Sequence, residues 1–133
     1  MENEKILRIL DANFNRLREG LRVIEEVERL ANNDENTFHQ LKTLRHDLAE
    51  CCRLIPRDIL LAARDSEHDV GRDRICASEA ERKDLTALSA ANFKRCQEAA
   101  RVIEEFAKLT YPAVAEKAKK IRFSLYDLEK LFL

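Results

Sequence analysis

The residues most able to do chemistry form two polar sets that share one spacing. Each set holds an asparagine, an arginine, a glutamate and a second arginine, three positions apart: Asn13, Arg16, Glu19 and Arg22, then Asn92, Arg95, Glu98 and Arg101. The planar guanidinium group of arginine suits bidentate binding of phosphate or carboxylate. A neighbouring carboxylate can orient a hydroxyl group or accept its proton. We interpret the two sets as an anion-binding site, with Glu19 or Glu98 as the candidate base.

The two sets belong to an internal repeat. Residues 12–26 read ANFNRLREGLRVIEE and residues 91–105 read ANFKRCQEAARVIEE, which match without a gap at ten of fifteen positions. A weaker match joins residues 44–54 to residues 121–131. Because such self-similarity indicates duplication, we expect a single domain, 1–133. Repeat one then lies at about 5–55, a linker and loop at 56–77, and repeat two at about 78–133.

Positions that differ between the two copies indicate which residues are on the surface and which are in packing contacts. Asn15 becomes Lys94 and Arg18 becomes Gln97, as expected for free surface. Gly20 becomes Ala99, which indicates a packing position. The second copy is also poorer in polar groups, so we expect one asymmetric site instead of two equal ones.

Helices must position these sets. Apolar periodicity predicts helices at 4–31, 37–54, 56–63, 78–109 and 113–131, with Thr37 and Gln40 as a capping box and Ser78 with Glu81 as another start signal. Residues 64–77 lack this periodicity. We therefore expect an all-α, internally duplicated bundle of about five to six helices with pseudo-two-fold symmetry. The two polar sets should meet in an enclosed seam that the 64–77 loop closes.

Composition agrees with a helical fold and excludes several function classes. The chain has 133 residues, 37% of them charged, but only 2 Gly and 2 Pro, too few turn signals for a many-stranded β fold. With 24 basic and 25 acidic side chains it has no bulk basic field for nucleic acid. No apolar run indicates a membrane span or a signal peptide, so we expect a cytoplasmic protein. The four cysteines show no metal-binding spacing and are interpreted mostly as buried hydrophobes.

Two glutamates fall on the apolar faces of the repeated helices. Glu25 lies beside the stripe that contains Phe14, and Glu104 takes the matching place in the second copy. Since a carboxylate there needs a partner, Arg22 and Arg101 are the expected ion-pair partners. Two interpretations stay open: a buried ion pair that ties each half to its twin, or a ligand-facing cluster.

The 64–77 loop concentrates charge and could contribute to the site. Asp65 and Asp69 are the type of oxygen ligand that Mg²⁺ takes beside substrate phosphates, and Gly71 would let the backbone approach a phosphate. Magnesium and arginine are parts that phosphoryl transfer needs, although a plain solvated loop is the alternative. The sequence has no glycine-rich phosphate loop. His46 is a weaker acid/base candidate whose alternative role is structural.

Longer stretches of the chain resemble a known family. The runs ILDANFNRLREGLRVIEE, LRHDL, LLAARDSEHDVG, ANFKRCQEAARVIEEFAKL and IRFSLYDLEKL together resemble the small helical hydroxymethylpyrimidine-phosphate kinases of thiamine biosynthesis. That family often occurs fused ahead of thiamine-phosphate synthase, and from these 133 residues we expect only the kinase step and not the synthase step. The resemblance implies ATP-dependent, Mg²⁺-assisted phosphorylation of hydroxymethylpyrimidine phosphate to the diphosphate. By motif match it also implies these site residues: Asn13, Arg16, Glu19, Arg22, Arg45, Arg64, Asp65, Asp69, Gly71, Asn92, Arg95, Glu98 and Arg101.

Three hypotheses follow. In the first, the chain is the kinase, the arginines neutralise phosphates, Asp65 or Asp69 holds Mg²⁺, and Glu19, Glu98 or Asp65 takes the catalytic role. In the second, a non-catalytic module binds a thiamine-pathway phosphate intermediate or partners thiamine-phosphate synthase. In the third, the polar sets are only an ion-pair seam in a structural domain. Self-association stays open in all three.

Overall fold

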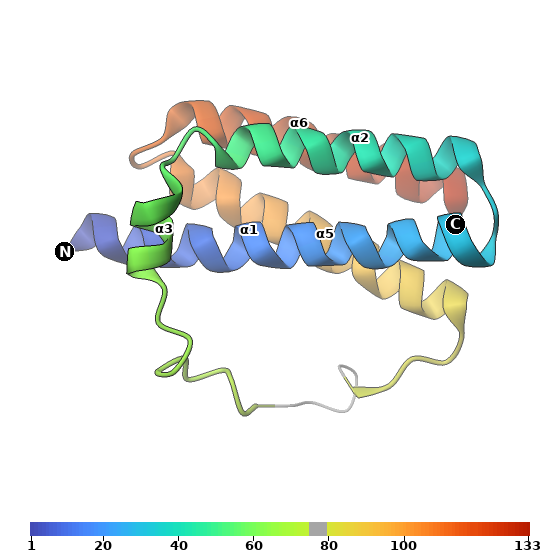
Figure 1. Ribbon diagram of the computed structural model, residues 1–133, viewed down its shortest axis with the longest axis horizontal. Coiled ribbons are helices and arrows are strands. Elements are labelled where there is room, and N and C mark those ends of the chain that lie inside the picture. The colour runs from blue at the N-terminus through green and yellow to red at the C-terminus, as the bar shows by residue number, and fades with distance from the viewer. Residues whose placement is uncertain (75–79) are drawn as a thin grey trace.

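Four long helices form a two-layer bundle in the computed structural model, which describes residues 1–74 and 80–133. Helix α1 (Glu2–Glu26), extended by the π-helical turn η1 (Val27–Ala31), and α5 (Leu85–Ala107) form one layer, while α2 (Glu35–Cys52) and α6 (Pro112–Phe132) form the other. Neighbouring helices run antiparallel, and the short α3 (Arg57–Ala63) crosses one end of the bundle (Figure 1). The described residues contain no strand, so the all-α prediction is confirmed.

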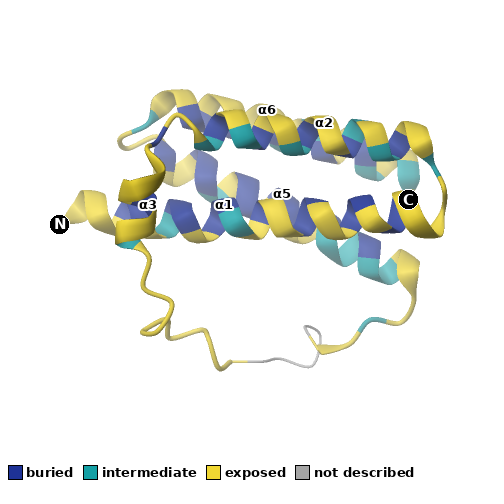
Figure 2. Cartoon of the chain, in the orientation of Figure 1, coloured by how far each residue is buried: buried dark blue, intermediate teal, exposed yellow. Residues whose placement is uncertain are grey.

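The core lies between the two layers, where the buried faces of all four long helices meet (Figure 2). The predicted apolar stripes are both buried; their members are Leu10, Phe14, Leu17, Leu21 and Ile24 in α1, and Phe93, Cys96, Ala100 and Ile103 in α5. Cys51 and Cys96 are free thiols packed in this core, and burial raises the pKa of each to about 12. Cys76 lies outside the described residues. No described helix is long and apolar enough to span a membrane.

Side-chain caps set the starts of two helices, and here the sequence predictions were wrong. Helix α2 begins at Glu35, because the Asp34 carboxylate accepts hydrogen bonds from the Thr37 backbone N–H (3.0 Å) and hydroxyl (2.6 Å). Thr37 is therefore the capped residue and not the cap, and the capping box with Gln40 does not form. Asp and Thr both favour the N-cap position, so residue type alone could not decide between Asp34 and Thr37.

The second error concerns the long helix of the second half. Helix α5 begins at Leu85, where the Asp84 carboxylate accepts from the Ala87 backbone N–H at 2.8 Å. The predicted start signal at Ser78 lies outside the described residues. The other predicted helix ends agree with the structure to within about two residues, a normal uncertainty for helix ends.

Replacing Asp34 with alanine should lower the melting temperature, because the α2 N-terminus loses its cap. The hydrogen bonds from Thr37 hold the pKa of Asp34 below its usual value. The cap therefore stabilises the fold above the unfolded-state pKa of about 4 and is lost as pH falls through the lower folded-state pKa. Thermal melts of the wild type and Asp34→Ala should differ at neutral pH and converge in acid. An equal difference at both pH values would contradict this role.

Contacts within the two halves repeat one another. The Asn13 side chain donates to the Ile9 carbonyl and the Asn92 side chain donates to the Leu88 carbonyl, both at 2.9 Å. The Cys96 thiol lies 3.7 Å from the carbonyl of Leu17, its counterpart 79 residues earlier. Internal duplication stays an interpretation of the sequence, and these paired contacts support it.

Candidate functional site

The groove between α1 and α5 brings together six of the predicted site residues. It has a volume of about 550 Å³ and is lined by five positions of the first repeat and their five counterparts: Asn13, Arg16, Glu19, Gly20 and Val23 with Asn92, Arg95, Glu98, Ala99 and Val102. Each member pairs with a residue 79 positions later. The groove is therefore two-fold symmetric in its lining, and we call it the dyad groove.

Close helix packing forms the floor of the dyad groove. Gly20 is buried in α1, and a Cβ atom placed on it would lie 2.5 Å from the Cys96 sulfur of α5. Its counterpart Ala99 is 3% exposed on the other side of the floor. The packing role inferred for Gly20 agrees with this close approach.

The dyad groove is open, which differs from the enclosed seam that we expected. Arg16, Glu19, Arg95 and Glu98 are exposed, because the small floor residues bring the helices close together and the longer side chains project outward. The described part of the loop, residues 64–74, lies on the α1 side of the bundle (Figure 1). None of its described residues, 64–74, lines the groove. The groove also balances two arginines with two glutamates, so it has no excess of positive charge.

Arg22 and Arg101 lie outside the dyad groove. Arg22 contacts Glu25 at 3.9 Å and Arg101 contacts Glu104 at 3.4 Å, as the spacing predicted. Closer partners come from the second helix of each half: Arg45 of α2 at 2.8 Å from Glu25, and Arg122 of α6 at 2.9 Å from Glu104. The buried ion pairs therefore tie the two helices within each half, and not each half to its twin.

A second pocket lies between α1, α2 and α3, and its cationic character was not predicted. It has a volume of about 570 Å³. Five guanidinium groups and one imidazole line it, against a single carboxylate: Arg18, Arg45, Arg53, Arg57, Arg64, His46 and Asp11. Its apolar lining comes from Phe14, Leu48, Ile55, Leu60 and Leu61. We call this the arginine pocket.

Two of these arginines are held in place by carboxylates. Arg64 makes a bidentate pair with Asp11, Nε to Oδ2 at 2.7 Å and Nη2 to Oδ1 at 2.9 Å, which raises the pKa of Arg64. Arg45 donates from Nε to Glu25. Within the described chain, Arg18, Arg53 and Arg57 form no ion pair with a carboxylate. A phosphate entering the pocket would therefore meet three arginines with no competing carboxylate.

The thiol of Cys52 also lines the arginine pocket. Burial raises the pKa of Cys52 to about 11, although the positive charges of Arg18 and Arg53 act in the opposite direction. The thiol is therefore protonated at neutral pH, and a protonated thiol is a poor nucleophile.

The loop carboxylates adjoin the arginine pocket. A smaller hollow of about 130 Å³ contains Asp65 and Asp69, and it shares Asp11, Asn15 and Arg64 with the pocket. We call it the loop hollow. Arg8 of α1 donates to the Asp65 carbonyl at 2.9 Å, which fixes this part of the loop to the bundle.

The loop carboxylates are also engaged by the loop itself. A hydrogen bond from the His68 ring holds the pKa of Asp65 below its usual value, and Asp69 accepts from the Gly71 backbone N–H at 2.8 Å. Gly71 lines neither the pocket nor the hollow. In the described part of the chain, no three His, Cys, Asp or Glu side chains gather to hold a metal. The two residues predicted as Mg²⁺ ligands, Asp65 and Asp69, both line the loop hollow, and Mg²⁺ in other proteins is held by one or two carboxylates together with substrate phosphates.

Sequence reasoning missed Arg18, Arg53 and Arg57 for identifiable reasons. Helix α3 forms one wall of the arginine pocket but has no counterpart in the repeat. A comparison of the two copies therefore could not identify its residues. Arg18 was interpreted as free surface because the second copy has glutamine there. Gln97 is itself buried and donates to Glu129 at 2.9 Å, so the free-surface interpretation was wrong for that residue. The available signal was the arginine spacing on both sides of Pro56.

Comparison with known proteins finds relatives that are similar to nearly the whole chain. The chain is 46% identical over 124 residues to the thiamine-phosphate synthase of Synechocystis sp., covering 93% of this chain and 35% of that protein. It is 43% identical over 125 residues to the thiamine-phosphate synthase of Rhodopirellula baltica, covering 94% of this chain and 33% of that protein. The chain thus spans about a third of these relatives, and no solved structure matches it significantly. Residues 8–131 match the ThiD2 family. On this match, the chain belongs to the ThiD2 family.

Proposed function

We propose that the chain binds a phosphorylated pyrimidine intermediate of thiamine biosynthesis in the arginine pocket. The observation that carries this proposal is the lining: five guanidinium groups and one carboxylate around an apolar wall. Guanidinium groups bind phosphate through charge-assisted hydrogen bonds, and the apolar wall can cover a flat heterocycle. The names of the relatives support the choice of pathway.

The reaction that we propose for this site is phosphoryl transfer from ATP, which would make the chain a hydroxymethylpyrimidine-phosphate kinase. The substrate phosphate oxygen attacks the γ-phosphorus of ATP, an oxygen–phosphorus bond forms, and the bond to ADP breaks. The loop hollow favours this reaction, because it places Asp65 and Asp69 beside Arg64. Mg²⁺ held there with the ATP phosphates would supply charge neutralisation. Arg18, Arg53 and Arg57 would hold the acceptor phosphate.

The residues proposed for proton transfer change with this placement. Glu19 and Glu98 line the dyad groove, while the arginine pocket lies on another face of α1. For a substrate in the pocket, His46 is the nearer candidate to accept a proton, since it lines the pocket, whereas Asp65 is proposed above as a Mg²⁺ ligand.

A second candidate function is a binding module without catalysis that partners thiamine-phosphate synthase. What favours it is the length comparison: relatives with that name are about three times as long, and this chain matches only one part of them. In this case the arginine pocket would hold the phosphate intermediate and the synthase would consume it.

One experiment separates the two functions. The chain is mixed with hydroxymethylpyrimidine phosphate, ATP and Mg²⁺, and the melting temperature and ADP release are both measured. Ligand-dependent stabilisation of about 3 kcal/mol is expected at a hundredfold excess over the Kd, together with ADP release that requires the pyrimidine. Stabilisation without ADP release would favour the binding module. If the folded chain shows no stabilisation and no ADP release, both functions are contradicted.

A further inference from the structure

Two equivalent arginines, one in each half, differ in how many of their guanidinium nitrogens donate hydrogen bonds. Arg122 uses all three guanidinium nitrogens: Nε and Nη2 donate to Glu104 at 3.1 and 2.9 Å, and Nη1 donates to the Tyr126 hydroxyl at 3.2 Å. Arg45 occupies the matching position of the first half, but its one side-chain hydrogen bond among the described residues is from Nε to Glu25 at 2.8 Å. Its two terminal nitrogens therefore stay available where the side chain lines the arginine pocket.

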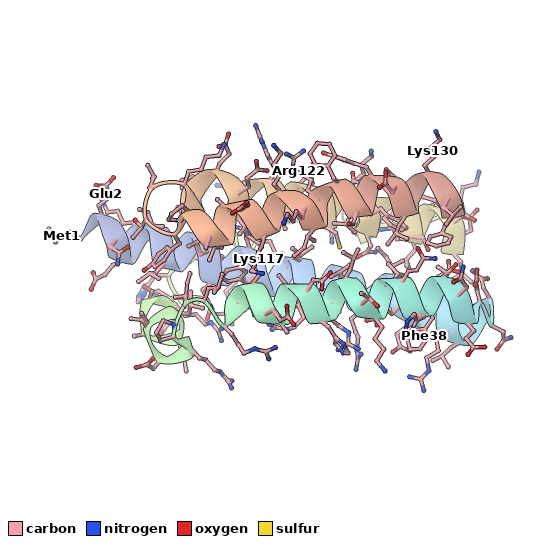
Figure 3. The ribbon with its side chains drawn as sticks, turned by 90° about the horizontal axis from the view of Figure 1, so that it is seen from above. Met1, Glu2, Phe38, Lys117, Arg122 and Lys130 are labelled. Carbon is pink, nitrogen blue, oxygen red and sulfur yellow. The ribbon has the colours of Figure 1, made fainter. Side chains whose placement is uncertain are left out.

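Neighbouring residues explain the difference. In the second half, Phe123 and Tyr126 flank Arg122, with ring centres 5.0 and 5.7 Å from its guanidinium carbon. Figure 3 shows Arg122 on α6, whereas the long and short helices that line the arginine pocket are α1, α2 and α3. The residues that match these aromatic rings in the first half are His46 and Ala49, which are smaller and line the arginine pocket instead. Arg45 therefore has neither of the two aromatic rings that flank Arg122 at the matching positions.

The buried glutamates that pair with these two arginines also differ in their hydrogen bonds. Glu25 is 1% exposed, and its Oε1 is the only buried side-chain oxygen or nitrogen in the described residues that lacks a hydrogen-bond partner. In the second half, both hydrogen bonds from Arg122 go to Oε1 of Glu104, and Oε2 of Glu104 lies 3.4 Å from Arg101. Leaving a buried acceptor unpaired is unfavourable, and such exceptions concentrate where function constrains a site.

We propose that Glu25 is the positioning residue of the arginine pocket: it holds Arg45 through Nε, so that both terminal nitrogens can bind a phosphate of the ligand. This proposal rests on the proposed function. It also explains why the two halves differ at this position. In the second half, Glu104 and Tyr126 accept hydrogen bonds from all three guanidinium nitrogens of Arg122, so none is left for a ligand. Glu25 itself does not line the pocket and acts only through Arg45.

Pyrophosphate binding measured by titration calorimetry tests the proposal. Glu25→Gln should weaken binding about tenfold, the equivalent of one charge-assisted hydrogen bond. The matched variant Glu104→Gln removes the same charge from the second half and should leave the Kd unchanged. In an Arg45→Gln background, Glu25→Gln should cause no further loss of affinity, whereas a merely structural role would lower affinity again.

A gain-of-side-chain variant keeps the test independent of stability. Ala49→Tyr places in α2 the hydroxyl that Tyr126 supplies in α6, and it should reduce pyrophosphate binding at least tenfold without lowering the melting temperature. Wild-type affinity in Glu25→Gln or Ala49→Tyr would overturn the positioning role alone. Failure of the wild-type chain to bind pyrophosphate would overturn the proposed function and this inference with it.

Discussion

Replacing Arg18 and Arg57 with glutamine is expected to weaken pyrophosphate binding about a hundredfold, because two charge-assisted hydrogen bonds are lost at about tenfold each. Both side chains line the arginine pocket, are exposed, and form no ion pair with a described carboxylate. The second repeat already has glutamine at the position of Arg18. The double variant should therefore keep the stability of the wild type and lose mainly its ligand.

The matched control is Arg16→Gln with Arg95→Gln, which removes two positive charges from the dyad groove. Arg16 and Arg18 project about 200° apart around α1, so bulk solvent and salt screen the groove from the pocket. Titration calorimetry at one fixed ionic strength should show wild-type affinity for this control. If the control loses affinity and the pocket variant does not, the phosphate site is the dyad groove.

Retention of residue types between the two copies predicted that the two polar sets meet, which holds for six of their eight residues, and it could do so because both walls of the dyad groove come from the repeat. Asn13 and Asn92, Arg16 and Arg95 kept their types at positions that a helix places on one face. Helical periodicity likewise predicted the buried stripes. These features depend on spacing along a single helix, which the sequence states directly.

The arginine pocket could not be predicted in the same way, because its walls come from three helices whose crossing no local pattern specifies. Arg53 and Arg57 flank Pro56, and only the turn there brings α3 across α1. The partners of Glu25 and Glu104 were mistaken for a similar reason. Spacing identified Arg22 and Arg101, whereas packing of the next helix supplied Arg45 and Arg122 at shorter distances.

Adding one methyl group at the floor of the dyad groove should destabilise the bundle measurably. In Gly20→Ala the new Cβ would lie 2.5 Å from the Cys96 sulfur, which is fully buried and close to the Leu17 carbonyl. Overpacking of a core costs about 1–3 kcal/mol, while alanine gains up to about 1 kcal/mol over glycine in a helix. The clash should prevail, so the free energy of unfolding in urea should fall.

The same substitution should change sign when the sulfur is removed. After the sulfur, the nearest atom to the added Cβ is the Asn92 carbonyl oxygen at 3.7 Å, an ordinary contact distance. In a Cys96→Ala background, Gly20→Ala should therefore be neutral or stabilising by up to about 1 kcal/mol, since only the helix preference of alanine remains. Urea unfolding of the wild type, the two single variants and the double variant gives the coupling directly. Equal destabilisation in both backgrounds would mean that contact with Cys96 does not explain the glycine, and that the helices approach each other for another reason.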